Sequence, residues 1–170
     1  MFSANIAADF RANSYSPSLL GFLRGWFFSP ALRLLILFRL ARYLQNERIP
    51  LIPKVLWRWS VSSSGCYFSL EAEIGGGICL PHPTGIVIGE GVVIGTGATV
   101  YQNVTMGRAQ VDEPSYPVLG DQVVVYPGAV LIGPINVGTR AIIAANAVVR
   151  QDVPARSLAV GVPARIITRE

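Results

Sequence analysis

Aliphatic side chains recur at every sixth position between residues 68 and 149, and this spacing restricts the possible folds more than any other feature. One run covers residues 68–86, a second, displaced by two positions, covers residues 88–106, and a third covers residues 119–149. A period of six matches neither an α-helix nor the two-residue alternation of an ordinary strand. It is typical of a solenoid of short strands, in which each turn adds the same inward-facing side chains.

Two further positions of each six-residue unit favour the same fold. The residue after the aliphatic one is often small (Gly75, Gly89, Gly95, Gly107, Gly120, Gly138 and Ala144). The position four after it is small or branched (Val92, Ala98, Val104, Val123, Ala129, Ile135, Ala141 and Ala147). Glycine suits corners where φ must be positive. We therefore predict an all-β solenoid over residues 66–155, followed by a tail over residues 156–170.

Residues 1–65 form a different, basic and apolar segment. They carry eight basic and two acidic residues, whereas the remainder carries six basic and eight acidic residues, so the net charge of +4 belongs to this segment. Residues 17–45 are predicted to be helical with a break at Ser29–Pro30, because serine caps a helix and proline suits its first turn. A shorter helical segment is expected over residues 55–61. The apolar stretches of residues 1–65 are shorter than the ~20 residues of a membrane-spanning helix.

Two roles remain open for this segment. Residues 17–60 could rest on an anionic membrane surface, which basic and aromatic side chains suit. Alternatively, the segment could pack on the open end of the solenoid or on another subunit. The whole chain is 51% hydrophobic and 14% charged, which favours burial of more surface by oligomerisation or membrane contact. Nucleic-acid binding is not expected, because the arginines lie among leucines and phenylalanines.

The two cysteines, Cys66 and Cys79, are predicted to be small buried hydrophobes. A metal pair lacks a third or fourth ligand nearby. Free thiols suit the reducing cytoplasm, and residues 1–13 are too polar for a secretory signal. We expect a cytoplasmic protein, with the inner face of the cytoplasmic membrane as a further location.

His82 is the only histidine, and it lies inside the repeat. A single imidazole on a rigid scaffold is a natural candidate for proton transfer near neutral pH. One histidine also excludes the three-histidine zinc site of β-helical carbonic anhydrases. Residues 108–117 interrupt the repeat with a polar insert, which is a candidate for contacting substrate because a loop leaving a solenoid is not needed for its core. The alternative is a tolerated surface insertion.

Three stretches give the chain a resemblance to a known family. They are the hexads themselves, the run from His82 to Glu90 (His-Pro-Thr-Gly-Ile-Val-Ile-Gly-Glu) with Gln102–Gly107, and the tail Gly161-Val-Pro-Ala-Arg165. Together they resemble the hexapeptide-repeat acyltransferases, in particular the serine O-acetyltransferase branch. The resemblance implies a left-handed parallel β-helix, assembled as a homotrimer with active sites between subunits. With the helices expected in residues 1–65, the predicted fold is this β-helix preceded by a short N-terminal helical segment.

The resemblance also implies a reaction: direct transfer of an acetyl group from acetyl-CoA to a hydroxyl, with no metal and no acyl-enzyme. His82 matches the family's general base, which is worth ~10²–10⁴-fold in rate. A backbone N–H at Gly107 would stabilise the oxyanion. The implied coenzyme A groove takes in Gly107, Arg108, Gly128, Ala129, Ala145, Arg150, Gly161, Pro163 and Arg165. Arginine suits phosphate, although Arg150 and Arg165 could equally be solvated surface charges.

The chain departs from the serine branch at two positions. Tyr67 occupies the place, fifteen residues before His82, of an aspartate that orients the catalytic ring. Either Tyr67, Glu71 or Glu73 replaces that aspartate, or the ring of His82 is held less firmly. Ser115-Tyr116-Pro117 stands where the branch has Arg-His-Pro. Some 65 residues also precede the repeat, fewer than the long helical domain that pairs two trimers.

These departures favour a saccharide acceptor, as in the capsule and exopolysaccharide O-acetyltransferases that the chain also resembles. An aromatic ring stacks on a pyranose, and the predicted acceptor-binding residues are Tyr67, Asp112, Glu113 and Tyr116. Serine O-acetyltransfer is the principal alternative, and another small hydroxyl or amine acceptor is a further one. A non-catalytic β-helix acting as a structural module is the alternative of another class.

Overall fold

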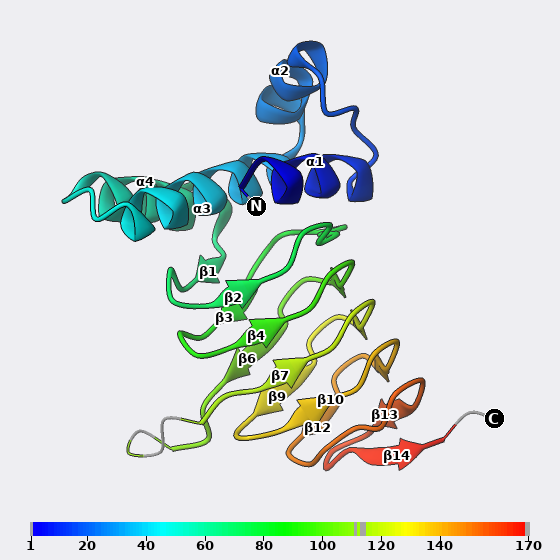
Figure 1. Ribbon diagram of the computed structural model, residues 1–170. Coiled ribbons are helices and arrows are strands. Elements are labelled where there is room, and N and C mark those ends of the chain that lie inside the picture. Colours follow the sequence, from blue (N-terminus) through cyan, green and yellow to red (C-terminus); the bar gives the residue numbers. More distant parts are fainter. Residues whose placement is uncertain (1, 111, 113–114, 169–170) are drawn as a thin grey trace.

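Figure 1 shows a helical layer set on one end of a three-sided coil of strands. The structure is a computed structural model and describes residues 2–110, 112 and 115–168. The helices in this described part are α1 (Phe2–Ala12), α2 (Leu19–Phe28), α3 (Pro30–Asn46) and α4 (Ile52–Ser64). All of them precede the first strand.

The strands are two or three residues long, and no further helix lies between them in the residues that the structure describes. They are β1 (Tyr67–Phe68), β2 (Glu73–Ile74), β3 (Val87–Ile88), β4 (Val93–Ile94), β5 (Thr99–Val100), β6 (Thr105–Gly107), β7 (Val118–Leu119), β8 (Val124–Val125), β9 (Val130–Ile132), β10 (Asn136–Val137), β11 (Ile142–Ile143), β12 (Val148–Val149), β13 (Leu158–Val160) and β14 (Arg165–Ile167).

These strands stack into three sheets that form the sides of a prism (Figure 1). Sheet A has the order β1-β3-β6-β9-β12, sheet B the order β10-β7-β4-β2, and sheet C the order β14-β13-β11-β8-β5. Neighbouring strands run parallel except the last pair, β13 and β14, which are antiparallel. The predicted solenoid is therefore confirmed as a parallel β-helix of hexapeptide repeats.

The core of the prism consists of the side chains that recur every sixth residue. The aliphatic position of each hexad is buried, and so is the small or branched residue four positions later, as at Val100 and Val104. Each such aliphatic side chain contributes ~1.5–3 kcal/mol when fully buried. The glycine after the aliphatic residue permits close stacking between coils, because a Cβ at Gly75 would lie 2.7 Å from the carbonyl carbon of Gly95.

Strand register locates the two-residue displacement in the sequence. Cys79 bridges to Thr99, 20 positions later, whereas Val87 pairs with Thr105, 18 positions later. The two extra residues therefore fall between Cys79 and Val87. The polar insert has a similar effect lower down, where Val93 pairs with Val118, 25 positions later. Both irregularities are thus widened corners that leave the core undisturbed.

The helical layer closes the open end of the β-helix through polar contacts. Asp9 of α1 accepts hydrogen bonds from the N–H groups of Gly77 (2.7 Å) and Ile78 (3.1 Å) and pairs with Arg39 of α3 at 2.9 Å. Arg39 in turn donates to the carbonyl oxygens of Ile74 and Gly75. Asp9 and Arg39 are both buried. The backbone of the first coil has no preceding coil to bond with, and these side chains satisfy it.

The helical part is larger than the short segment that we predicted. Ser29 caps α3 as expected, accepting a hydrogen bond from the N–H of Leu32 at 3.2 Å. Helix α1 was missed, because its contact with the β-helix depends on Asp9 rather than on an apolar stripe. Packing of the segment on the end of the solenoid is confirmed.

No single helix in the described residues has the length and apolar composition to cross a membrane. Helices α2 and α3 satisfy that test only as a pair, and they are bent by 109° at their junction.

Candidate active site

His82 lies on the widened corner between sheets C and A of the first coil. Its side chain is exposed and lines a hollow of about 470 Å³ between this corner and the helical layer. The walls of the hollow come from residues 12–14 at the end of α1, residues 28–31 at the junction of α2 and α3, and residues 79–84. The two extra residues thus place the imidazole outside the prism, facing the helices.

The corner is held from both sides of His82. On one side, Asn13 accepts a hydrogen bond from the N–H of Leu80 at 3.1 Å and donates to the carbonyl of Ile78 at 2.9 Å. On the other, the N–H of Thr84 donates to the His82 carbonyl at 2.8 Å. Asn13 also lines the hollow. The helical layer therefore fixes the backbone that presents the imidazole.

The imidazole ring itself is less constrained than its backbone. Within the described part of the chain, neither ring nitrogen of His82 has a hydrogen-bond partner. Glu71 instead accepts a hydrogen bond from Gln45 of α3 at 3.1 Å. Burial lowers the pKa of Arg42 on the same helix, and the nearby negative charge of Glu73 opposes that shift. Tyr67 packs edge-on against Trp57, with ring centroids 5.4 Å apart. The proposed substitutes for the orienting aspartate are therefore not joined to His82 in this chain.

A row of rings and small residues continues below His82 along the same edge of the prism. The His82 ring lies 6.4 Å from that of Tyr101, which stacks on Tyr126 at 5.2 Å. Backbone bonds follow the row, from Asn103 to Thr84, from Gly128 to Gln102 and from Asn146 to Pro127. The tyrosine pair was not predicted, because the insert between the two residues obscures their equivalent positions in successive coils.

Four predicted coenzyme A contacts lie on this edge and remain accessible, namely Gly128, Ala145, Gly161 and Pro163. A fifth, Ala129, is fully buried, so its side chain belongs to the core and cannot contact a ligand. Gly128 also has a role within the chain: its φ is +71°, and a Cβ there would collide with the amide oxygen of Asn146. Glycine at this position is thus explained by the fold alone.

The remaining predicted residues lie elsewhere. His82 lies at the edge of sheet A where its strands begin, which we call the entry edge. Gly107 ends β6 and Arg150 follows β12, so both lie at the other edge, where the strands of sheet A end and which we call the exit edge. Arg165 lies in β14 on sheet C. A Cβ added to Gly107 would meet no atom of the described residues within 4 Å. Gly107 therefore borders open space that a ligand or a neighbouring subunit can occupy.

The base of the insert is anchored at this exit edge. Tyr116 donates a hydrogen bond from its hydroxyl to Glu90 Oε1 at 2.7 Å, and its ring lies where a Cβ at Gly91 would be. This bond raises the pKa of Tyr116, and the nearby positive charge of Arg108 opposes the shift. Asp112 is exposed, and Glu113 lies outside the described residues.

Both cysteines are free thiols. Cys66 is buried in the core and Cys79 is half-buried beside the hollow. Burial raises the pKa of each thiol, which keeps it protonated and unreactive.

A three-sided β-helix built on hexads, with an exposed histidine on a widened corner, defines an acyltransferase of the hexapeptide-repeat class. Residues 116–151 match the family model described as "Bacterial transferase hexapeptide (six repeats)". A serine acetyltransferase of Synechococcus elongatus is 35% identical over 166 residues, which is 96% of this chain and 68% of the relative.

Two solved structures agree with the whole fold, helical layer included. Soybean serine acetyltransferase complexed with serine is 30% identical and superposes with a TM-score of 0.87, over 98% of this chain and 69% of that one. A serine acetyltransferase in complex with CoA is also 30% identical, with a TM-score of 0.84 over 96% and 68% of the two chains. The chain belongs to the serine acetyltransferase family and is an acetyl-CoA-dependent O-acetyltransferase.

This finding corrects the expected acceptor. The saccharide acceptor and the closer likeness to capsule and exopolysaccharide enzymes were wrong, because the matching relatives are serine acetyltransferases. The sugar-stacking argument also relied on Tyr116, whose ring and hydroxyl are engaged within the chain. Family membership likewise decides against a non-catalytic module and favours the serine alternative.

Proposed function

We propose that this enzyme transfers the acetyl group of acetyl-CoA to the hydroxyl of L-serine, the step that supplies cysteine biosynthesis. The observation that carries the proposal is the 35% identity over 96% of the chain to a serine acetyltransferase. The superposition on a serine-bound relative supports the same acceptor. The free thiols suit a reducing compartment such as the cytoplasm.

In this proposal His82 is the general base. It removes the proton of the serine hydroxyl as that oxygen attacks the thioester carbon, forming the new C–O bond. Collapse of the tetrahedral intermediate breaks the C–S bond, and the proton passes from His82 to the departing sulfur. A backbone N–H beside the open space at Gly107 is the candidate oxyanion donor.

Acetyl-CoA is proposed to lie along the edge below His82. The small residues Gly128, Ala145 and Gly161 succeed one another there and leave room for an extended ligand. Arg150 and Arg165 are exposed and are proposed to bind its phosphates, for which the guanidinium geometry is suited. Arg150 lies at the other edge of sheet A, so in this proposal it acts from a neighbouring subunit.

The proposed acceptor site uses the charged groups at the base of the insert. An amino acid needs a cation for its carboxylate and an anion for its ammonium group. Arg108 and Glu90 are both close enough to Tyr116 to influence its titration. We assign Arg108 to the serine carboxylate and Glu90 to the ammonium group, with Tyr116 holding the insert in place.

These assignments need a second subunit. His82 precedes β3 and Arg108 follows β6, and both strands belong to sheet A. One chain therefore presents the two residues at opposite edges of that sheet. In a homotrimer, the entry edge of one subunit can face the exit edge of the next and complete the site. We therefore propose a trimer with three active sites, each shared by two chains.

The test is release of free thiol from acetyl-CoA with L-serine as acceptor, compared with D-serine, L-alanine and ethanolamine. The proposal expects turnover with L-serine alone, because alanine lacks the hydroxyl, ethanolamine lacks the carboxylate and D-serine misplaces one of the three groups. Turnover with ethanolamine equal to that with L-serine would remove Arg108 from carboxylate recognition. A lack of L-serine turnover by an enzyme that binds acetyl-CoA would overturn the acceptor.

A further inference from the structure

The helical layer has a large exposed apolar surface on the side away from the β-helix. Of the eighteen large hydrophobic side chains exposed in the described residues, twelve lie between Leu19 and Trp59. The most exposed are on α2 and at the start of α4, including Leu19 (78%), Phe27 (70%) and Val55 (66%). Such a concentration marks an interaction surface rather than the scattered exposure of an ordinary protein.

Helix α2 is built to present these side chains outward. Its two glycines, Gly21 and Gly25, are buried, and a Cβ at Gly25 would lie 2.6 Å from the side chain of Leu32 on α3. The small residues therefore face the protein, and leucine and phenylalanine face away from it. This arrangement is the reverse of a helix that packs its apolar face into a core.

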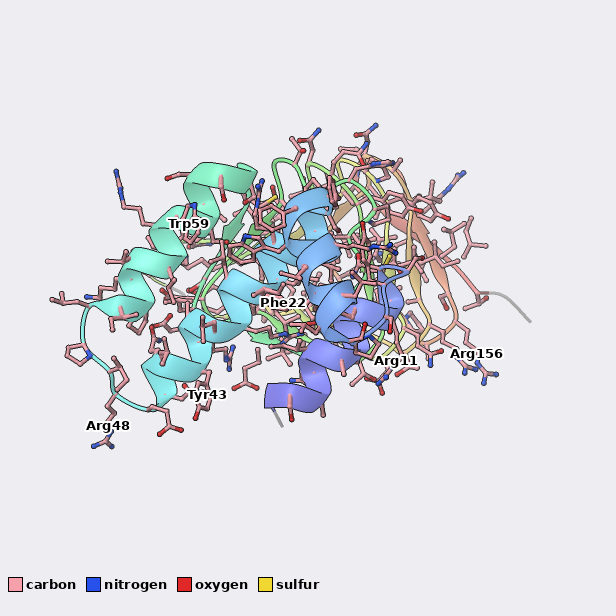
Figure 2. All side chains as sticks on the ribbon, turned by 90° about the horizontal axis from the view of Figure 1, so that it is seen from above. Arg11, Phe22, Tyr43, Arg48, Trp59 and Arg156 are labelled. Carbon is pink, nitrogen blue, oxygen red and sulfur yellow. The ribbon has the colours of Figure 1, made fainter. Side chains whose placement is uncertain are left out.

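Aromatic contacts join α2 to its neighbours as one platform. Phe22 stacks on Phe10 at 6.3 Å and on Trp26 at 6.3 Å, and Trp26 meets Trp59 of α4 edge-on at 5.7 Å. Figure 2 looks down on this layer, with Phe22 near its centre and Trp59 on α4. The apolar side chains of α2 and α4 thus belong to a single surface, which we call the helical platform.

The exposed charge around the helical platform is almost entirely positive. Arg11, Arg24, Arg48, Lys54 and Arg58 are exposed, against one exposed carboxylate, Glu47, because Asp9 is buried with Arg39. Two copies facing each other through the platform would bring these like charges together, at an electrostatic cost. An anionic surface complements them, and tryptophan and phenylalanine favour the interface between water and lipid.

We propose that the helical platform binds the surface of an anionic phospholipid bilayer, with α2 lying in the interface and the β-helix directed away from it. At 10 residues α2 is roughly 15 Å long, about half the hydrocarbon thickness, so it lies on the bilayer. The acetyltransferase is thereby held at a membrane, with its active-site edges in the aqueous phase.

The test is co-sedimentation of the full chain with vesicles of phosphatidylcholine, with and without phosphatidylglycerol. Binding is expected to the anionic vesicles and to weaken with salt, accompanied by a blue shift of tryptophan emission as Trp59 enters the interface. The double variant Leu20→Gln/Phe27→Gln and the variant Arg24→Glu should each lower binding about tenfold or more. Arg156→Glu, an exposed arginine of the β-helix, is the matched charge control and should bind as wild type (Figure 2).

Circular dichroism and acetyl-CoA binding confirm that each variant is folded. Equal binding of wild type to pure phosphatidylcholine would overturn the electrostatic part of the proposal. Absence of binding to the anionic vesicles would overturn it entirely. If wild type does not bind vesicles and Leu20→Gln/Phe27→Gln lowers the molecular mass of the assembly in solution, another copy of this chain covers the helical platform instead.

Discussion

His82 projects from a corner that is two residues longer than the corresponding corner of the next coil. Its backbone is held through Leu80 and Thr84, while its ring nitrogens have no partner in the described residues. The chain thus fixes where the imidazole stands and leaves its orientation to the substrate or to a neighbouring subunit.

Replacing His82 by alanine should lower kcat by ~10²–10⁴-fold, because the proposed acceptor hydroxyl loses its proposed general base. Acetyl-CoA affinity and the proposed trimer should be nearly unchanged, since the side chain is exposed and its only ring contact in the described residues is with Tyr101. Steady-state kinetics, calorimetric binding of acetyl-CoA and molecular mass in solution check this. Loss of the folded trimer would make His82 a structural residue instead.

Two glycines assigned to the site should respond differently to alanine. Gly107→Ala meets no atom of the described residues within 4 Å, so unfolding free energy should change by no more than ~0.5 kcal/mol. Gly128→Ala places a Cβ at a φ of +71° and against Asn146, and should destabilise by ~1–2 kcal/mol or more.

Kinetics complete this comparison. If the space beside Gly107 holds the reacting groups, Gly107→Ala lowers kcat/KM at least about tenfold, as expected of a group placed against the transition state. Urea denaturation with activity measurements on both variants separates the two effects. Full activity in Gly107→Ala would move the oxyanion site elsewhere.

At the scale of elements, the contact between α1 and the first coil depends on a buried ion pair. Asp9→Ala leaves Arg39 buried without its counter-ion and should cost ~3–5 kcal/mol of unfolding free energy. Arg11→Ala, on the same helix and exposed, is the control and should stay within ~0.5 kcal/mol. Urea midpoints for the two variants decide the matter, and equal midpoints would mean that apolar packing alone attaches the layer.

The same contact shows what the sequence could and could not predict about the elements. The aliphatic positions that the hexads predicted are all buried, because each coil repeats one local environment. Ser29 predicted the start of α3 because capping is local. Helix α1 was not predicted, because Asp9 contacts Gly77 and Ile78, which are 68 and 69 positions later in the sequence. The anchoring of the insert was not predicted for the same reason, since Tyr116 binds Glu90, which lies 26 positions earlier.

At the scale of the whole molecule, the proposed division of the site between two edges predicts complementation between inactive chains. His82→Ala removes the entry-edge group and Arg108→Ala the exit-edge group. Every mixed trimer of the two variants would retain one interface in which both groups are native. Co-refolded mixtures should therefore recover activity that neither variant shows alone.

The control for complementation is a chain that carries both substitutions, mixed with either single variant. No such mixture contains an interface with both native groups, so its activity should not exceed that of the single variant. Preformed trimers of the two single variants, combined without refolding, should also remain inactive. Absence of recovery in mixed trimers of confirmed composition would place the whole site within one chain.

The sequence identified His82, the small-residue corners and the polar insert, because each either interrupts the repeat or recurs at a fixed position in it. Their relative placement could not be identified in this way, because it depends on which edge of the prism each corner joins. The acceptor was mispredicted for a related reason: an exposed aromatic in a loop suggested stacking on a sugar, whereas Tyr116 is engaged with its own chain.

The final strand, β14, runs back along β13 in the opposite direction. A solenoid whose last coil ended in a parallel strand would offer the next molecule a ready template, and successive copies could extend it into a fibre. The reversed strand presents the wrong hydrogen-bonding pattern for another parallel coil in sheet C, while the helices block the other end. Both ends of the β-helix therefore disfavour end-to-end stacking of copies into a fibre. The three sides of the prism remain available for side-by-side association of subunits.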